Sequence, residues 1–162
     1  MIQSKTRQEQ KLEQLRSMSY LLDSAIPIPG TRYRIGLDPI LGLLPAVGDY
    51  LGAIFSGYIV VKAARMGASK EVLSRMTGNI ILEAFVGTIP LVGDLFDAGW
   101  KANVKNIELL ETHLDLQPPQ SRQRTEWVFL GLLLGGLTLA VLLFAALSIS
   151  ILTALFRLLG FQ

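Results

Sequence analysis

The residues with the clearest chemical potential are polar side chains in an otherwise apolar stretch: Asn79, Glu83, Asp94, Asp97, Lys101 and Asn103. Asn79 and Glu83 are four residues apart, as are Asp97 and Lys101, and side chains at this spacing meet on one face of a helix. Two roles fit the set. These groups could form internal hydrogen bonds that fix how helices pack, or the carboxylates and Asn103 could line a path for a hydrated cation.

The sequence lacks the residues for nucleophilic or phosphate-transfer chemistry. It has no cysteine and a single histidine, His113, which excludes disulfides, thiolate ligands and histidine clusters. It contains neither a Walker loop nor a GxGxxG motif after a strand. A carboxylate site at Glu83, Asp94 and Asp97 would suit Mg²⁺ or Ca²⁺, but helix capping explains these residues equally well. We therefore predict no enzymatic activity, no catalytic residue, no metal site and no cofactor.

Several of these polar residues belong to an internal repeat. Residues 37–49 read LDPILGLLPAVGD, and residues 82–94 read LEAFVGTIPLVGD, so the pattern G-x-x-P-x-x-G-D occurs twice. Proline removes a backbone donor and glycine permits a positive φ. We expect Pro45 and Gly48, and in the second copy Pro90 and Gly93, to end one helix and let another begin.

The aspartate after each break stands where a helix is expected to start. Asp49 and Asp94 are predicted as N-caps, with Asp97 in the first turn of the second of these helices. The alternative is that carboxylates in an apolar segment mark an ion or proton path.

Thirty consecutive residues without a charge, 127–156, predict one transmembrane helix, because about twenty residues cross a hydrocarbon core. A polar linker at 117–126 precedes this helix, and a short tail at 157–162 follows it. Arg122 and Arg124 lie before the helix and Arg157 after it, so the positive-inside rule favours a cytoplasmic body and an external C-terminus.

Small residues follow one face of this predicted helix. Gly131 and Gly135 form a GxxxG pattern that Thr138 continues. Because small residues let two helix backbones approach closely, we predict a seam for a homo-oligomer here.

The segment before the linker divides into two parts. Residues 1–30 predict an amphipathic helix that ends at Pro27, and their polar start lacks the apolar region of a signal peptide. Residues 31–116 are expected to form a duplicated helical-hairpin domain, with repeats at about 37–62 and 82–107.

The connector between the repeats is basic, with Lys62, Arg65, Lys70 and Arg75 against Glu71. By the positive-inside rule the connector stays in the cytoplasm, so neither repeat crosses the membrane only once. Either each repeat dips into the membrane as a re-entrant hairpin, or the repeats pack as a water-soluble helical body.

Overall composition points to a membrane protein. The chain has 162 residues, of which 51% are hydrophobic and 17% charged, and its net charge is +2. This charge is too small for nucleic-acid binding but is compatible with anionic lipid headgroups.

The segments LDS at 22–24, IPGTR at 28–32, GLLPAVGD at 42–49, IPLVGDLFD at 89–97 and KAN at 101–103 resemble the family called domain of unknown function 4112. The resemblance covers about residues 12–112 and leaves the predicted transmembrane helix outside. Because the family is uncharacterised, it implies no activity, ligand or catalytic residue.

We predict an all-α membrane protein with duplicated broken-helix hairpins and one C-terminal transmembrane helix. The expected function is that of an oligomeric scaffold or assembly protein, with the lipid bilayer, further copies of itself and an unidentified protein as partners. The alternative is a subunit of a small ion or solute pore with carboxylates at the helix breaks. A bacterial inner membrane or another internal membrane is the expected location.

Overall fold

The computed structural model describes residues 6–27, 29–30, 34–35, 47–89, 100–116 and 126–160. This part of the chain is mostly helical, as predicted. It contains α1 (Arg7–Ser24), β1 (Ile26–Pro27), β2 (Arg34–Ile35), α3 (Val47–Arg65), α4 (Lys70–Gly87), α6 (Ala102–Leu116) and α7 (Trp127–Leu158).

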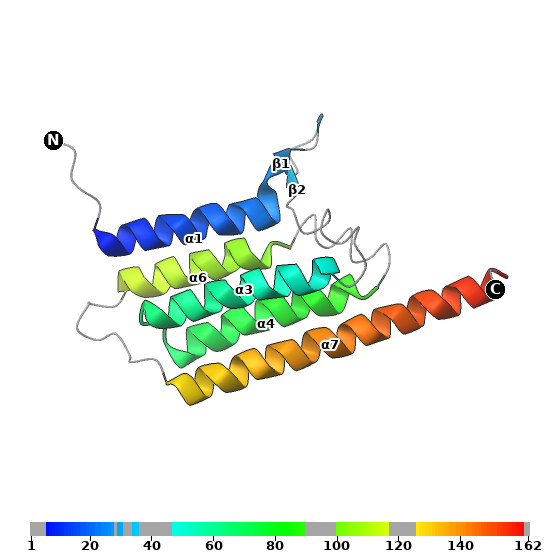
Figure 1. The fold of residues 1–162 in the computed structure, drawn as a ribbon. Helices are drawn as coiled ribbons and strands as arrows, with labels where there is room; N and C mark the ends of the chain where they lie inside the picture. The colour runs from blue at the N-terminus through cyan, green and yellow to red at the C-terminus, as the bar shows by residue number, and fades with distance from the viewer. Residues whose placement is uncertain are drawn as a thin grey trace.

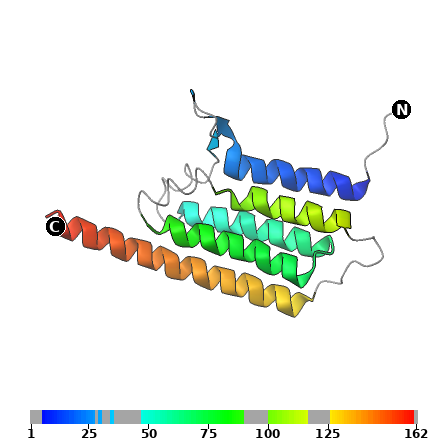
Figure 2. The same cartoon turned by 180° about the vertical axis from the view of Figure 1, so that it is seen from behind.

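The helices lie side by side in a layered bundle (Figures 1 and 2). α1 packs on α6, α6 packs on α4, and α7 packs on both α3 and α4. The turn between α3 and α4 lies at the same end of the bundle as the start of α7, and we call this end the turn end (Figure 1). At the opposite end, the far end, α3 begins, α4 stops and α6 begins.

The α3–α4 turn is built by a glycine and a serine. Gly67 has φ +94°, and the amides of Gly67 and Ala68 donate to the carbonyls of Ala64 and Ala63. This bond pair is a Schellman motif, which requires a left-handed residue after the helix end. Ser69 then accepts a hydrogen bond from the Val72 amide as the N-cap of α4. The chain therefore reverses within a few residues and leaves α3 and α4 antiparallel.

α1 starts with a capping box and ends at a small hairpin. The Thr6 hydroxyl accepts from the Glu9 amide, and the Glu9 carboxylate accepts from the Thr6 amide at 2.7 Å. After α1, Ile26 pairs with Ile35 in a two-stranded antiparallel ladder. The sequence predicted a helix that ends at Pro27, but α1 ends at Ser24 and Ile26–Pro27 form a strand, which a two-residue length hides from any periodic signal.

A single apolar core runs through the bundle. Ile59, Val60, Met76 and Leu110 are its largest fully buried apolar side chains. α1 adds Leu15 and Leu22, and α7 adds Leu130, Leu137 and Val141. The core therefore joins α7 to the rest of the bundle.

The predicted breaks fall largely outside the described residues. Pro45, Pro90, Gly93, Asp94 and Asp97 are among the residues left undescribed. α4 ends at Gly87, before the second break.

The predicted N-cap position of Asp49 is wrong. α3 already begins at Val47, so Gly48 and Asp49 have helical backbone in its first turn. The helix starts closer to Pro45 than the prediction assumed.

Candidate functional site

Polar side chains meet where the end of α1, the start of α6 and the middle of α4 come together. We call this set the polar cluster, and its members are Asp23, Ser24, Asn79, Glu83, Lys101, Asn103 and Asn106. Four of them were singled out from sequence: Asn79, Glu83, Lys101 and Asn103. Asp23, Ser24 and Asn106 were not selected as site residues.

Two carboxylates from other helices cap the start of α6. Asp23 accepts from the Asn103 side-chain amide at 2.8 Å and from the Val104 backbone amide at 2.9 Å. Glu83 accepts from the Ala102 backbone amide at 3.2 Å. These two backbone amides belong to the first turn of α6 and have no partner within that helix. α1 and α4 therefore supply both the acceptors and the negative charge that a helix start favours.

Asn106 joins α6 to α4 through both ends of its side chain. Its carbonyl oxygen accepts from the Asn79 side-chain amide at 2.8 Å, and its own amide donates to the Met76 carbonyl at 3.1 Å. Asn106 is fully buried. Because a buried amide left unpaired is costly, these bonds fix the register of the two helices.

Lys101 completes the cluster at its outer edge. Its ammonium group donates to the Ser24 hydroxyl at 2.7 Å and to the Arg34 carbonyl at 3.1 Å. Arg34 donates in turn to the Ser24 carbonyl and lies 5.1 Å from the centre of the Tyr20 ring. The segment after α1 is thereby tied to the start of α6.

The polar cluster holds helices together by hydrogen bonds between elements that are distant in sequence. Within the described part of the chain, no group of three His, Cys, Asp or Glu residues is arranged to hold a metal ion. The contacts described above join α1, α4 and α6.

Residues 11–114, nearly two thirds of the chain, match the family model described as Domain of unknown function (DUF4112). The chain belongs to this family. The match begins in α1 and ends in α6, so it includes the whole polar cluster and leaves α7 outside. No curated protein and no solved structure matches the chain.

Charged side chains of α1, α3 and α4 gather toward the turn end. Among the side chains that the structure describes, α1 carries its exposed charges in its first ten residues, α3 has the half-buried Lys62 and the exposed Arg65 in its last turn, and α4 carries its exposed charges in its first two turns: Arg7, Glu9, Lys11, Glu13, Arg16, Lys62, Arg65, Lys70, Glu71 and Arg75. α6 runs toward this end and adds Glu111 and Asp115. Glu111 forms an ion pair of 2.6 Å with Arg16, and this contact raises the Arg16 pKa.

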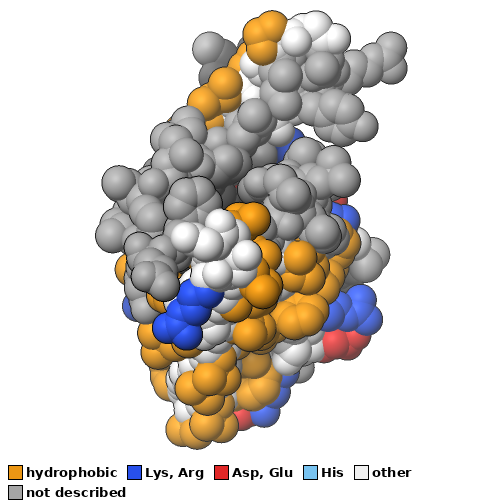
Figure 3. Space-filling view, turned by 90° about the vertical axis from the view of Figure 1, so that its right-hand side faces the viewer, with side chains coloured by type: hydrophobic (Ala, Val, Ile, Leu, Met, Phe, Trp, Pro, Cys, Tyr) orange, Lys and Arg blue, Asp and Glu red, His pale blue; other side chains and the backbone are white. Residues whose placement is uncertain are grey.

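The far half of the DUF4112 region has few described charges, and each is engaged with a neighbour. Asp23, Glu83, Lys101 and Arg34 have the partners given above, and Lys105 lies 4.2 Å from the centre of the Trp100 ring. Exposed apolar side chains surround them: Tyr20, Leu21, Ile26, Ile54, Phe55, Leu82, Phe85 and Ile89. In the view toward the far end, hydrophobic side chains form much of the visible described surface, and some Lys, Arg, Asp and Glu side chains are also visible (Figure 3).

α7 packs one face on the DUF4112 region and exposes the rest. Leu130, Leu137 and Val141 are buried against the bundle, and the Phe144 ring lies 5.4 Å from the Phe85 ring of α4. α7 is the one helix of the described chain that is long and apolar enough to cross a membrane.

The small residues of α7 lie away from its packed face. Gly131, Gly135 and Thr138 are all exposed. A Cβ added to either glycine would have no neighbour within 4 Å. The predicted seam therefore lies on an exposed side of α7.

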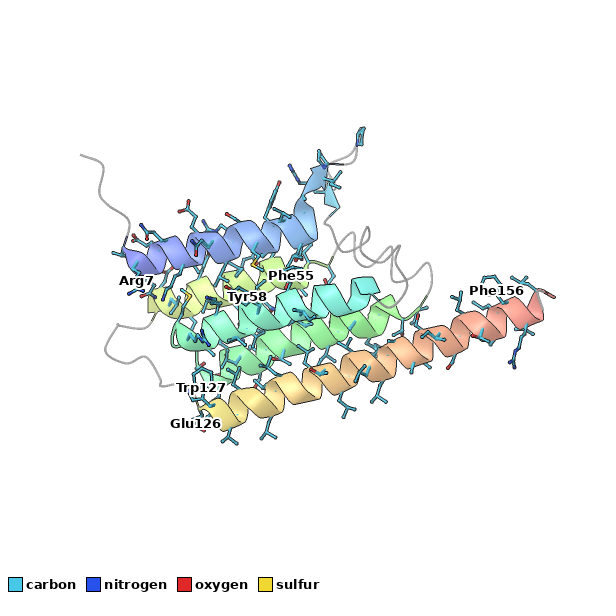
Figure 4. All side chains as sticks on the ribbon, viewed as in Figure 1. Arg7, Phe55, Tyr58, Glu126, Trp127 and Phe156 are labelled. Atoms are coloured by element: carbon cyan, nitrogen blue, oxygen red, sulfur yellow. The ribbon has the colours of Figure 1, made fainter. Side chains whose placement is uncertain are left out.

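The start of α7 is tied to the α3–α4 turn by charged and aromatic groups. Lys70 forms an ion pair of 2.6 Å with Glu126, and the Lys70 ammonium lies 5.4 Å from the centre of the Phe129 ring. The Arg65 guanidinium lies 5.7 Å from the centre of the Trp127 ring. Figure 4 labels Glu126 and Trp127 at this corner and Phe156 at the opposite end of α7.

Proposed function

We propose that the protein is an integral membrane scaffold, in which α7 crosses the bilayer and the far half of the DUF4112 region enters the membrane beside it. The observation that carries this proposal is the separation of charge along the bundle. Water-facing charges gather at the turn end, while the far half exposes apolar side chains and keeps its described charges in internal contacts.

The packing of α7 supports insertion of the far halves of α3 and α4. α7 has 32 residues, about 48 Å of helix, and it contacts both α3 and α4. Its contacts extend from Leu130 at the turn end to Phe144, which meets Phe85 near the end of α4. If α7 spans the bilayer, the two helices packed along it are brought to the same depth. α3 and α4 each begin or end beside one of the two predicted breaks, so this depth is compatible with the proposal that the breaks lie within the membrane.

The turn end is proposed to face the cytoplasm. It holds the basic connector with Lys62, Arg65, Lys70 and Arg75, and cytoplasmic segments are enriched in lysine and arginine. The C-terminus then lies outside, and a bacterial inner membrane or another internal membrane is the proposed location.

The polar cluster favours a scaffold over the alternative of a pore subunit. Asn79, Glu83 and Asn103 form hydrogen bonds between helices, as groups that fix packing do. Partners of this scaffold are proposed to be further copies of the chain and an unidentified protein.

Cysteine labelling tests the insertion, because the chain has no native cysteine. Ile54→Cys and Phe85→Cys lie in the far half, while Gln10→Cys and Ser74→Cys are exposed controls at the turn end. With a membrane-impermeant thiol reagent, we expect the controls to react from the cytoplasmic face. Ile54→Cys and Phe85→Cys should react only after detergent dissolves the membrane, and Leu158→Cys should react from the other face.

A different labelling result would contradict the proposed membrane insertion. If Ile54→Cys and Phe85→Cys react in intact vesicles as fast as Ser74→Cys, the far half lies in water. The same measurement on purified protein in liposomes distinguishes shielding by lipid from shielding by another protein.

The oligomer seam has a matched control within α7. Gly131, Gly135 and Gly136 all have open space where a side chain would start, but only the first two form the GxxxG pattern. We expect Gly131→Ile with Gly135→Ile to abolish the oligomer seen by cross-linking in membranes, because bulky residues prevent close helix approach. Gly136→Ile should retain it. Equal cross-linking of all variants would exclude this seam.

A further inference from the structure

One side of α3 changes from apolar to basic along its length. Ile54 is 64% exposed and Tyr58 is 43% exposed, and the half-buried Lys62 and the exposed Arg65 follow toward the turn end. Positions 54, 58, 62 and 65 are spaced by four, four and three residues, so they share one side of the helix. We call these four residues the α3 stripe. Figure 4 labels Tyr58 on this helix, with its neighbour Phe55.

The basic end of the α3 stripe is held by aromatic rings. The Lys62 ammonium lies 4.9 Å from the centre of the Tyr58 ring, and the Arg65 guanidinium lies 5.7 Å from that of Trp127. A cation over an aromatic face keeps its positive charge, because the ring offers no counter-charge. Both cations therefore remain available to bind an anion.

Neighbouring cations differ in this respect. Lys70 is paired with Glu126, and Arg75 is paired with Glu71 at 2.7 Å. Among the residues that the structure describes, neither Lys62 nor Arg65 forms an ion pair with a carboxylate. Lys62 and Arg65 are therefore cations of α3 without a described acidic partner, and both lie at the basic end of the α3 stripe.

The order of side chains on the stripe matches that of groups in a phospholipid. Eleven residues separate positions 54 and 65, a rise of about 16 Å along the helix. Apolar side chains suit acyl chains, tyrosine and tryptophan suit the interface, and lysine and arginine suit an anionic phosphate. In the proposed orientation the basic end lies at the cytoplasmic headgroups.

We propose that the α3 stripe, together with Trp127, is a binding site for an anionic phospholipid. Lys62 and Arg65 bind the phosphate, Tyr58 and Trp127 flank the headgroup region, and an acyl chain lies along Ile54 and Phe55. The site rests on the proposed membrane insertion, and it adds a preference for anionic over zwitterionic lipid.

Tryptophan fluorescence can test this preference. The chain has two tryptophans, so Trp100→Phe leaves Trp127 as the sole reporter. The protein is reconstituted in phosphatidylcholine vesicles that contain brominated phosphatidylcholine or brominated phosphatidylglycerol at equal mole fraction. We expect stronger quenching by the brominated phosphatidylglycerol, with a local enrichment on the order of fivefold for each cation that contacts the phosphate.

Charge-matched variants identify the residues responsible. Lys62→Gln with Arg65→Gln should equalise quenching by the two brominated lipids. Lys11→Gln with Arg75→Gln removes the same charge elsewhere and should keep the preference. The exchange Lys62→Arg with Arg65→Lys should also keep it, which separates loss of the site from loss of the fold. Inorganic phosphate should not displace the lipid, and displacement by phosphate alone would overturn the assignment to a phospholipid.

Two further results would count against the site in different ways. If both brominated lipids quench Trp127 strongly and equally, the protein is inserted but has no anionic-lipid site. If neither lipid quenches Trp127, the site is excluded and membrane insertion fails with it.

Discussion

α4 contacts α6 and α7 in chemically different ways. In the contact with α6, the Asn79 side-chain amide donates a hydrogen bond to Asn106, and the Glu83 carboxylate accepts one from the Ala102 backbone amide. In the contact with α7, apolar side chains pack together, and the Phe85 ring lies against the Phe144 ring. The α4–α6 interface depends on hydrogen bonds with fixed geometry. The α4–α7 interface depends mainly on apolar packing, with the exposed ion pair of Lys70 and Glu126 at its start.

The difference shows which interface specifies the arrangement of the helices. A buried donor or acceptor that loses its partner costs about 1 to 3 kcal/mol, so the α4–α6 contact tolerates no sliding. Apolar contacts are less directional, and within a bilayer they gain no hydrophobic driving force because lipid tails are equally apolar. The DUF4112 region thus carries the directional contacts, and α7 packs on a surface that is already formed.

The largest loss of stability is expected at Asp23, whose hydrogen bonds join α1 to the start of α6. Asp23→Ala removes the acceptor of the Asn103 side chain and the Val104 amide, and two buried donors without partners should lower the free energy of unfolding by about 3 kcal/mol. Chemical denaturation in mild detergent, followed by circular dichroism, measures this change. Asp23→Asn keeps one acceptor oxygen and should lose less. A stability of Asp23→Ala equal to that of the wild type would contradict the capping role.

A smaller loss is expected at the amide pair between α4 and α6. Asn106→Ala leaves the partly buried Asn79 amide and the Met76 carbonyl without their partner and should cost about 2 kcal/mol. A double-mutant cycle with Asn79→Ala, read by the same denaturation experiment, should give a coupling energy of about 1 kcal/mol. Strict additivity of the two changes would show that the pair contributes no interaction.

At the apolar interface between α7 and the bundle, Leu137→Ala tests how much the packing of α7 contributes to the free energy of unfolding. The change opens a cavity between α7 and the bundle, but without a hydrophobic driving force in lipid or detergent we expect a loss of about 1 kcal/mol. Leu139→Ala, on the exposed side of α7, is the matched control and should leave stability unchanged. If Leu137→Ala destabilises the protein more than Asp23→Ala does, the ranking of the two interfaces is reversed.

The smallest effect is expected for the ion pair between Lys70 and Glu126, whose side chains are 51% and 62% exposed. Exposed pairs contribute below about 1 kcal/mol and are screened by salt. A double-mutant cycle with Lys70→Gln and Glu126→Gln should give a coupling energy that disappears at high salt. A coupling that persists at high salt would mean that this corner is shielded from water.

α7 could be read from the sequence almost residue by residue. The uncharged run predicted a helix over 127–156, and the structure extends it to Leu158. A long run of apolar residues is a local property, and no distant part of the chain is needed to recognise it. The amphipathic spacing of Leu15 and Leu22 in α1 is local in the same sense, and both side chains are buried.

The partners in the polar cluster could not be predicted in this way. Asn79 and Glu83 were expected to share a helix face, and both do contact α6, but spacing alone does not name Asn106 or the Ala102 amide as their partners. Asp23 is 80 residues before Asn103 in sequence. Only the packing of α1 on α6 brings them together, and no periodicity within either helix encodes it.

The capping of α6 by residues from other helices has a consequence for synthesis. A helix with its own N-cap can start alone, whereas the first amides of α6 depend on Asp23 and Glu83. The ribosome completes both of these residues before it reaches Ala102, and domains generally fold from the N-terminus as they are made. When α6 leaves the exit tunnel, its two acceptors are therefore already present, and the last helix of the DUF4112 region joins a template that the earlier helices provide.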